Sequence, residues 1–130
     1  MISRRAILIS GALLSFAVAG SAQAADAQPF SNEAFTSAQA AGKPILIDIS
    51  ATWCPTCKAQ EPIIGTLRKS EKFKDFVMFR VDFDEQKDAV KSFGARSQST
   101  LIVYKGKLEV GRSVGDTNPA SIETLLEKAI

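Results

Sequence analysis

The feature that most constrains the fold is a short run at residues 45–50, which reads Ile-Leu-Ile-Asp-Ile-Ser. Nearly every position in this run is apolar, as in a strand that is buried on both faces. Such strands are typical of parallel sheets that carry helices on both sides. The run therefore predicts an α/β fold, and its one charged residue, Asp48, calls for a separate explanation.

The remaining segments supply the helices and strands that such a sheet needs. Helices alternate with strands along most of the chain, which predicts parallel pairing, and Lys105-Gly106-Lys107 predicts a hairpin with antiparallel pairing. The expected architecture is a three-layer sandwich, with a central mixed sheet of four to five strands and helices on both faces. The predicted elements are a helix that opens at Phe30-Ser31, with Ser31 as its cap, and ends at 42–44, strand 45–50, helix 54–70, strand 76–83, helix 85–93, strands 101–104 and 108–114, and a final helix from residue 118.

The second helix is predicted to begin with Cys54-Pro55-Thr56-Cys57. Pro55 suits the first helical position, because the N–H that it lacks would be unpaired there. Cys54 then becomes the N-cap and faces the free N–H groups and the positive end of the helix dipole. Both favour a thiolate, so we expect a pKa for Cys54 below the usual ~8.5. Cys57 lies on the same face of the helix, within disulfide reach.

This arrangement predicts thiol–disulfide exchange. Cys54, expected to be exposed at the helix tip, would attack a substrate disulfide, and Cys57, one turn deeper, would resolve the mixed disulfide. The chain has no histidine, so Asp48 is the candidate base for Cys57, because burial in an apolar strand raises the pKa of a carboxyl group. The alternative is a structural carboxylate, satisfied by backbone donors, by Arg80 or by Lys58.

Two other uses of the cysteine pair fit the sequence less well than redox chemistry. A structural zinc site needs about four ligands, and the chain has two cysteines and no histidine, so no metal is expected. A structural disulfide gains little from closing so short a loop, although a non-catalytic disulfide at the helix tip remains an alternative. Thiol–disulfide exchange needs no bound organic cofactor, and none is expected.

Residues 1–24 have the pattern of a cleavable signal peptide. A short basic start is followed by an apolar stretch at 6–20, and Ala22-Gln23-Ala24 fits the small-x-small cleavage rule. The predicted organisation is a signal peptide at 1–24, a linker at 25–29 and one domain at 30–130. Export points to the periplasm; an uncleaved membrane anchor is the alternative, and the choice between general and twin-arginine export stays open.

Arg4 and Arg5, both in the predicted leader, account for the net charge of +2. The domain itself is then electrically balanced. A balanced domain has no electrostatic footprint for nucleic acid, so no nucleic-acid partner is expected.

Residues 45–58 resemble the active-site segment of the thioredoxin family. Asp48 matches the buried aspartate of the family, and Trp53 matches the tryptophan before the first cysteine. Further matches are Pro62 inside the active-site helix, Arg80 near the aspartate and Gly115 after the last strand. The resemblance covers about residues 30–130 and implies a thioredoxin-like fold and a thiol–disulfide oxidoreductase with a redox-active Cys54–Cys57 disulfide.

Two details of the resemblance bear on the direction of the reaction. Pro55-Thr56 is similar to the dipeptide in the periplasmic thioredoxins of cytochrome c maturation, which are reductants. The segments at 34–35 and 41–44 resemble small periplasmic thioredoxins and the C-terminal domain of the transmembrane thiol reductant transporter. The resemblance thus implies a monomeric reductase of protein disulfides, supplied by an upstream thiol reductant in the membrane. An oxidase or isomerase of the same fold, or a redox-inactive adaptor, remains an alternative.

The resemblance has one departure, at Ser99. Thioredoxins place a cis-proline directly before a threonine, and here Ser99 precedes Thr100. A cis bond before a non-proline residue costs ~2.5–4 kcal/mol, so the Gln98–Ser99 peptide is predicted to be trans. We expect a reshaped substrate groove with an extra N–H and a hydroxyl beside Cys54; drift in a degenerate redox protein is the alternative. The residues expected to contact a substrate are Trp53, Pro55, Thr56, Ser99, Thr100 and Gly115.

Overall fold

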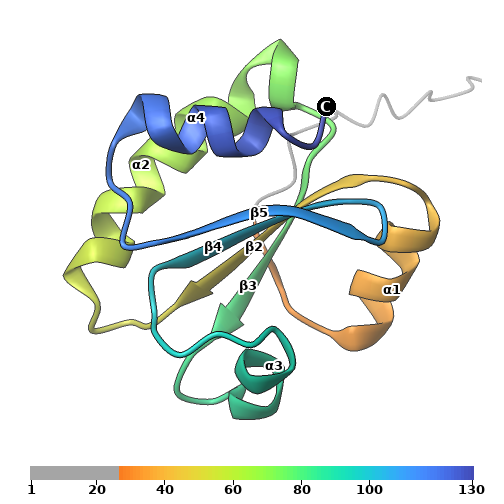
Figure 1. Cartoon of the computed structure of the whole chain (residues 1–130). Helices are drawn as coiled ribbons and strands as arrows, with labels where there is room; N and C mark the ends of the chain where they lie inside the picture. The colour runs from red at the N-terminus through yellow and green to blue at the C-terminus, as the bar shows by residue number, and fades with distance from the viewer. Residues whose placement is uncertain (1–26) are drawn as a thin grey trace, which may run out of the picture.

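Five strands form one mixed sheet at the centre of the protein, which a computed structural model describes over residues 27–130 (Figure 1). The strand order is β1-β3-β2-β4-β5, with β1 and β2 parallel to β3, and with β4 antiparallel to both β2 and β5. The strands are β1 Gln28–Pro29, β2 Pro44–Ser50, β3 Val77–Asp82, β4 Thr100–Lys105 and β5 Leu108–Val114. The helices are α1 Asn32–Ala40, α2 Pro55–Lys69, α3 Lys87–Ser92 and α4 Pro119–Glu127, with the 3-10 helix η1 at Glu71–Phe73. The predicted α/β sandwich is confirmed.

Helices cover both faces of the sheet, α2 and α4 on one side and α1 and α3 on the other (Figure 1). Neighbouring residues of β2 point to opposite faces, as they must in any strand. Ile45, Ile47 and Ile49 pack in the apolar cluster on the α1 and α3 side, whereas Leu46 packs in the cluster that contains Ile64 of α2. By the same alternation Asp48 points to the face that α2 covers.

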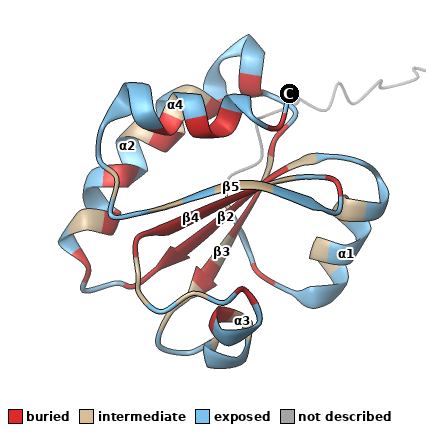
Figure 2. Ribbon diagram, viewed as in Figure 1, coloured by how far each residue is buried: buried red, intermediate tan, exposed pale blue. Residues whose placement is uncertain are grey.

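Buried residues concentrate in the central strands β2, β3 and β4 (Figure 2). The side chains of β2 are almost free of solvent contact, which confirms the prediction from its apolar sequence. The strand ends at Ser50, and the chain turns directly into α2. The first turn of α2 therefore lies at the carboxyl end of β2, where α/β folds commonly place their functional groups.

Three details differ from the sequence prediction. Gln28–Pro29, assigned to the linker at 25–29, forms strand β1 at the sheet edge, a position that tolerates proline. Helix α3 begins at Lys87 instead of residue 85, because the Asp82 carboxylate accepts the amides of Asp84 and Glu85 (2.9 and 3.0 Å) and holds a turn there. The short helix η1 was not predicted.

The predicted signal peptide at 1–24 lies outside the described residues. Within 27–130, no helix has both the length and the apolar character needed to cross a bilayer.

Phe79 of β3 tests the contribution of the cluster on the α1 and α3 side. Its ring is buried and makes edge contacts with Phe30 and Phe35, with both pairs of ring centroids 6.2 Å apart. Phe79→Ala is expected to lower the free energy of unfolding by about 3–5 kcal/mol, because it leaves a cavity. Denaturant titration measures this change. The control Leu108→Ala, at a side chain that is 68% exposed, should change stability by less than about 0.5 kcal/mol. Equal losses in the two variants would contradict the assignment of the core.

Candidate active site

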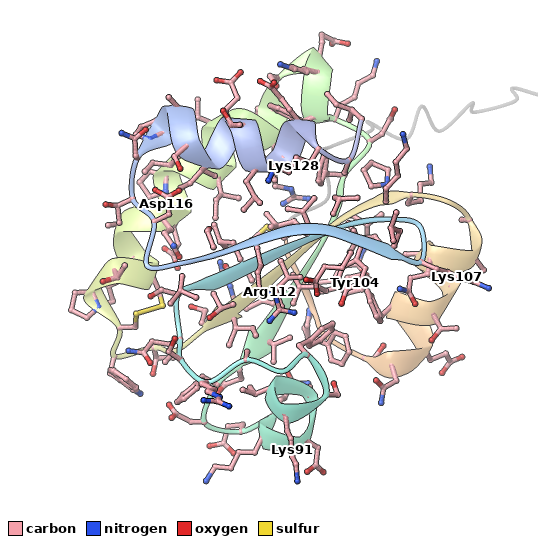
Figure 3. The ribbon with its side chains drawn as sticks, viewed as in Figure 1. Lys91, Tyr104, Lys107, Arg112, Asp116 and Lys128 are labelled. Carbon is pink, nitrogen blue, oxygen red and sulfur yellow. A yellow bond between two sulfur atoms is a disulfide. The ribbon has the colours of Figure 1, made fainter. Side chains whose placement is uncertain are left out.

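The Cys54–Cys57 pair lies at the N-terminus of α2. Cys54 is the N-cap residue, Pro55 takes the first helical position, and the Cys57 amide donates to Cys54 Sγ at 3.1 Å. The two cysteines form a disulfide with their Cα atoms 5.3 Å apart, drawn in yellow in Figure 3. The predicted cap and the predicted pairing are therefore present. The helix directs an amide N–H at the sulfur atom that would carry the charge after reduction.

The predicted exposure of Cys54 is wrong for this disulfide form. Cys54 is 1% exposed and Cys57 is 3% exposed, so exposure does not separate their roles. The two cysteines pack with Ala51 and Phe83 in a small apolar cluster. Their difference is one of position on the helix, because Cys54 caps α2 while Cys57 lies within its first turn. In this form neither cysteine is open to solvent.

The backbone of Ser99 is fixed from three directions. Its amide donates to the Ile49 carbonyl oxygen at 2.8 Å, while its own carbonyl oxygen accepts the Gly115 amide at 2.9 Å and Gln60 Nε2 at 3.4 Å. No peptide bond within 27–130 is cis, so the predicted trans Gln98–Ser99 bond is confirmed. Ser99 has a φ of +63°, the one positive value outside glycine in this part of the chain.

The Ser99 hydroxyl lies beside both sulfur atoms. Ser99 Oγ is 3.1 Å from Cys54 Sγ and 3.2 Å from Cys57 Sγ. The expected hydroxyl beside Cys54 is thus present, and its contact with Cys57 was not foreseen. The extra N–H expected in a substrate groove is not free to bind a substrate, because it donates to the Ile49 carbonyl oxygen. Ser99 is buried and belongs to the interior of the site.

The surface around the disulfide contains four of the residues expected to contact a substrate. Trp53, Pro55 and Gly115 are exposed, and Thr56 is half-buried. The side chain of Thr100 does not lie on this surface, because it is buried and donates its hydroxyl to the carbonyl oxygen of Ser97 at 2.7 Å.

Trp53 has a partner that sequence reasoning missed. Its Nε1 donates to Asp84 Oδ2 at 2.8 Å, and this bond orients the exposed indole. The two residues are 31 positions apart and belong to different loops, so no local pattern links them. The only signal in the sequence was an acidic residue after the strand that pairs with β2.

Asp48 is buried on the face of the sheet that α2 covers. Arg80 NH2 lies 3.3 Å from Asp48 Oδ2, so Arg80 is the partner, one of the two basic residues considered from the sequence. Asp48 Oδ1 has no hydrogen-bond partner among the described residues. Burial raises the pKa of the Asp48 carboxyl; Arg80 opposes this rise, and the negative charge of Glu61 adds to it. A carboxyl group of this kind is suited to accept a proton near neutral pH.

Arg80 connects Asp48 to the surface. Its other terminal nitrogen lies 3.8 Å from Glu61 Oε1, and its side chain is 40% exposed. Arg80 and Glu61 also line a cavity of about 110 Å³, together with Lys58 and Asp82. The pair formed by Asp48 and Arg80 is therefore next to a cavity that Arg80 itself lines.

Thiol–disulfide exchange at the cysteine pair needs no metal ion. Within 27–130, no three His, Cys, Asp or Glu side chains gather in a way that would hold a metal ion.

Comparison with known proteins agrees with this chemistry. The sequence model of the thioredoxin family matches residues 26–128. Thioredoxin-2 of Saccharomyces cerevisiae is 40% identical over 90 residues, which cover 68% of this chain and 84% of that protein. Thioredoxin Asp f 29 of Aspergillus fumigatus is 34% identical over 84 residues, or 65% of this chain and 76% of that one. The crystal structure of Trxlp from Edwardsiella tarda superposes with a TM-score of 0.75 at 44% identity, covering 78% of this chain and 98% of that chain.

Asp48→Asn tests the charge state of the buried carboxyl group. A raised pKa in the folded protein means that folding favours the protonated form, so stability falls as the pH rises from the unfolded pKa of ~3.9 through the folded value. The neutral amide escapes this loss. The variant should therefore be more stable than the wild type at neutral pH, and the advantage should shrink in acid. Denaturant titrations across pH measure both, and a wild type that is the more stable form at neutral pH would contradict the raised pKa.

Proposed function

Because the chain belongs to the thioredoxin family and is a thiol–disulfide oxidoreductase, we propose that it reduces protein disulfides through Cys54 and Cys57. The observation that carries the proposal is the amide of Cys57 directed at Cys54 Sγ, at the N-terminus of α2. A sulfur atom in this position is favoured as a thiolate, and the thiolate is the nucleophile of disulfide exchange.

The reaction has two exchange steps. The Cys54 thiolate attacks one sulfur of a substrate disulfide, forms a mixed disulfide and expels the other substrate sulfur as a thiolate. The Cys57 thiol then loses its proton, and its thiolate attacks Cys54 Sγ, which releases the second substrate thiolate. Two electrons pass to the substrate, and the protein is left with the Cys54–Cys57 disulfide.

Asp48 is the proposed acceptor of the Cys57 proton. It points to the face covered by α2, the helix that carries Cys57, and burial raises its pKa. The cavity that Arg80 and Glu61 line beside it offers a route by which the proton leaves to water.

The proposed direction is reduction, in the periplasm. Pro55-Thr56 between the cysteines is similar to the dipeptide of periplasmic reductants, and residues 1–24 have the pattern of an export signal. Electrons would come from the dithiol of a membrane protein by the same exchange chemistry. The equilibrium with glutathione tests the direction: a potential near the strongly oxidising end would instead support an oxidase or an isomerase.

Insulin reduction tests the activity itself. The wild type should accelerate the reaction, whereas Cys54→Ser should fall to the uncatalysed rate because the nucleophile is gone. Ser70→Ala, at the far end of α2, is the control and should keep the wild-type rate. Cys57→Ala should accumulate mixed disulfides on Cys54, which non-reducing gels and mass spectrometry identify. Equal rates for the wild type and Cys54→Ser would instead support a redox-inactive adaptor.

Expression of the full chain in a Gram-negative host tests the proposed export. The mass of the periplasmic protein should correspond to a chain that begins at Ala25, and Ala24→Leu should block this cleavage. Joint replacement of Arg4 and Arg5 by lysine should stop export only if the route is the twin-arginine one. Full-length protein in the membrane fraction would contradict cleavage and support the anchored form.

A further inference from the structure

The Ser99 hydroxyl stands between the two reacting sulfur atoms. Its distances to Cys54 Sγ and Cys57 Sγ, 3.1 and 3.2 Å, are nearly equal, and these sulfur atoms are its only partners within 27–130. All three groups are buried, so water does not compete for the hydroxyl proton. A hydroxyl group carries a single proton that rotates toward the better acceptor.

The backbone holds this hydroxyl in place at a conformational cost. A φ of +63° is unfavourable for serine, and it persists because hydrogen bonds fix the amide and the carbonyl oxygen of Ser99. These bonds come from the end of β2, from the turn after β5 and from Gln60 of α2. Three elements therefore cooperate to present one side-chain donor to the disulfide.

We propose that Ser99 is a further catalytic residue, whose hydroxyl donates to the Cys54 thiolate in the reduced protein and to the Cys57 thiolate in the mixed disulfide. A sulfur atom in a disulfide is a weak acceptor, whereas a thiolate is a strong one, because hydrogen bonds to charged groups are the stronger kind. The hydroxyl therefore gains most when one of the sulfur atoms is ionised. This inference rests on the proposed function only for the order of the two steps.

The rotation of the hydroxyl follows the charge through the reaction. After Cys54 attacks a substrate disulfide, its sulfur atom becomes neutral, and the Ser99 proton is free to turn toward Cys57. The Cys57 proton leaves to its acceptor, and the hydroxyl stabilises the thiolate that remains. When Cys57 attacks Cys54 Sγ, the protein disulfide forms and the substrate thiolate departs. The Ser99 proton stays on Oγ throughout, so the serine is unchanged at the end.

The donor also shifts the balance between the reduced and oxidised protein. Stabilising a thiolate favours the reduced form, so the disulfide becomes easier to reduce. A proline at this position would supply no donor, and it would also lose the bond from the Ser99 amide to the Ile49 carbonyl oxygen. Ser99 thus gives this chain a means of setting its reduction potential that a proline cannot provide.

Single-thiol variants separate the two contacts. In Cys57→Ala the only thiol is Cys54, and in Cys54→Ser it is Cys57; the pH dependence of alkylation reports the pKa of each. Adding Ser99→Ala should raise both pKa values by about 1–2 units, the range for a lost hydrogen bond to a charged group. Adding Ser99→Gly should do the same, while removing the strain of the positive φ. Ser113→Ala, which removes another buried hydroxyl, is the control and should change neither value.

The equilibrium with glutathione gives an independent readout in the protein with both cysteines. Ser99→Ala and Ser99→Gly should each favour the disulfide about tenfold or more relative to the wild type, which corresponds to ~30 mV per factor of ten. If Ser99→Ala does not fold, Ser99→Gly still tests the donor, because glycine accepts the native φ.

Three results would overturn the proposal. Unchanged pKa values in both Ser99 variants would rule out the donor, and a shift in the alanine variant alone would assign the effect to the backbone. A pKa shift for Cys54 without one for Cys57 would show that the hydroxyl does not donate to the Cys57 thiolate. A wild type that fails to reduce insulin would instead defeat the proposed function and leave these titrations to be judged separately.

Discussion

The hydrogen bond from the Cys57 amide to Cys54 Sγ is the interaction on which the rest of the site depends. It exists because Cys54 caps α2, and Cys54 can cap α2 because Pro55 occupies the first helical position. The buried strand β2 delivers the chain to this point, so the helix begins where the sheet ends. A disulfide between cysteines only three positions apart adds little to stability, and its value lies in the position of its sulfur atoms.

A second set of contacts ties the opposite side of the disulfide to the sheet. β4 runs antiparallel to β2 with Ile49 opposite Thr100, and this register brings Ser99 to the carboxyl end of β2. Gln60, buried in α2, donates to the carbonyl oxygens of Ser99 and of Asp116, which Figure 3 labels. The helix that carries the cysteines therefore also fixes the loop that carries the serine. The same elements therefore hold both sides of the site.

The sequence predicted what local patterns determine and missed what distant contacts determine. The buried strand β2, the cap at Cys54 and the trans bond before Ser99 each follow from a few neighbouring residues, and all three are confirmed. The bond from Trp53 to Asp84 joins positions 31 apart, and the contact between Ser99 and Cys57 joins positions 42 apart. Cys54 is buried in a cluster that includes Phe83 from a distant segment, so reasoning from its place at a helix tip gave the wrong exposure.

Ser99 is neutral whereas Asp48 is ionisable, and this difference suits a buried reaction. A lysine in place of Ser99 would be a stronger donor, but burying its charge would be costly while the sulfur atoms are neutral. A hydroxyl adds no net charge, so it is tolerated in the disulfide form and becomes favourable when a thiolate appears. Asp48, on the sheet face that α2 covers, carries an ionisable group, and Arg80 beside it offsets part of the cost of its charge. Both groups thus limit the cost of charge in a buried site, because Ser99 adds no charge of its own and Arg80 offsets part of that of Asp48.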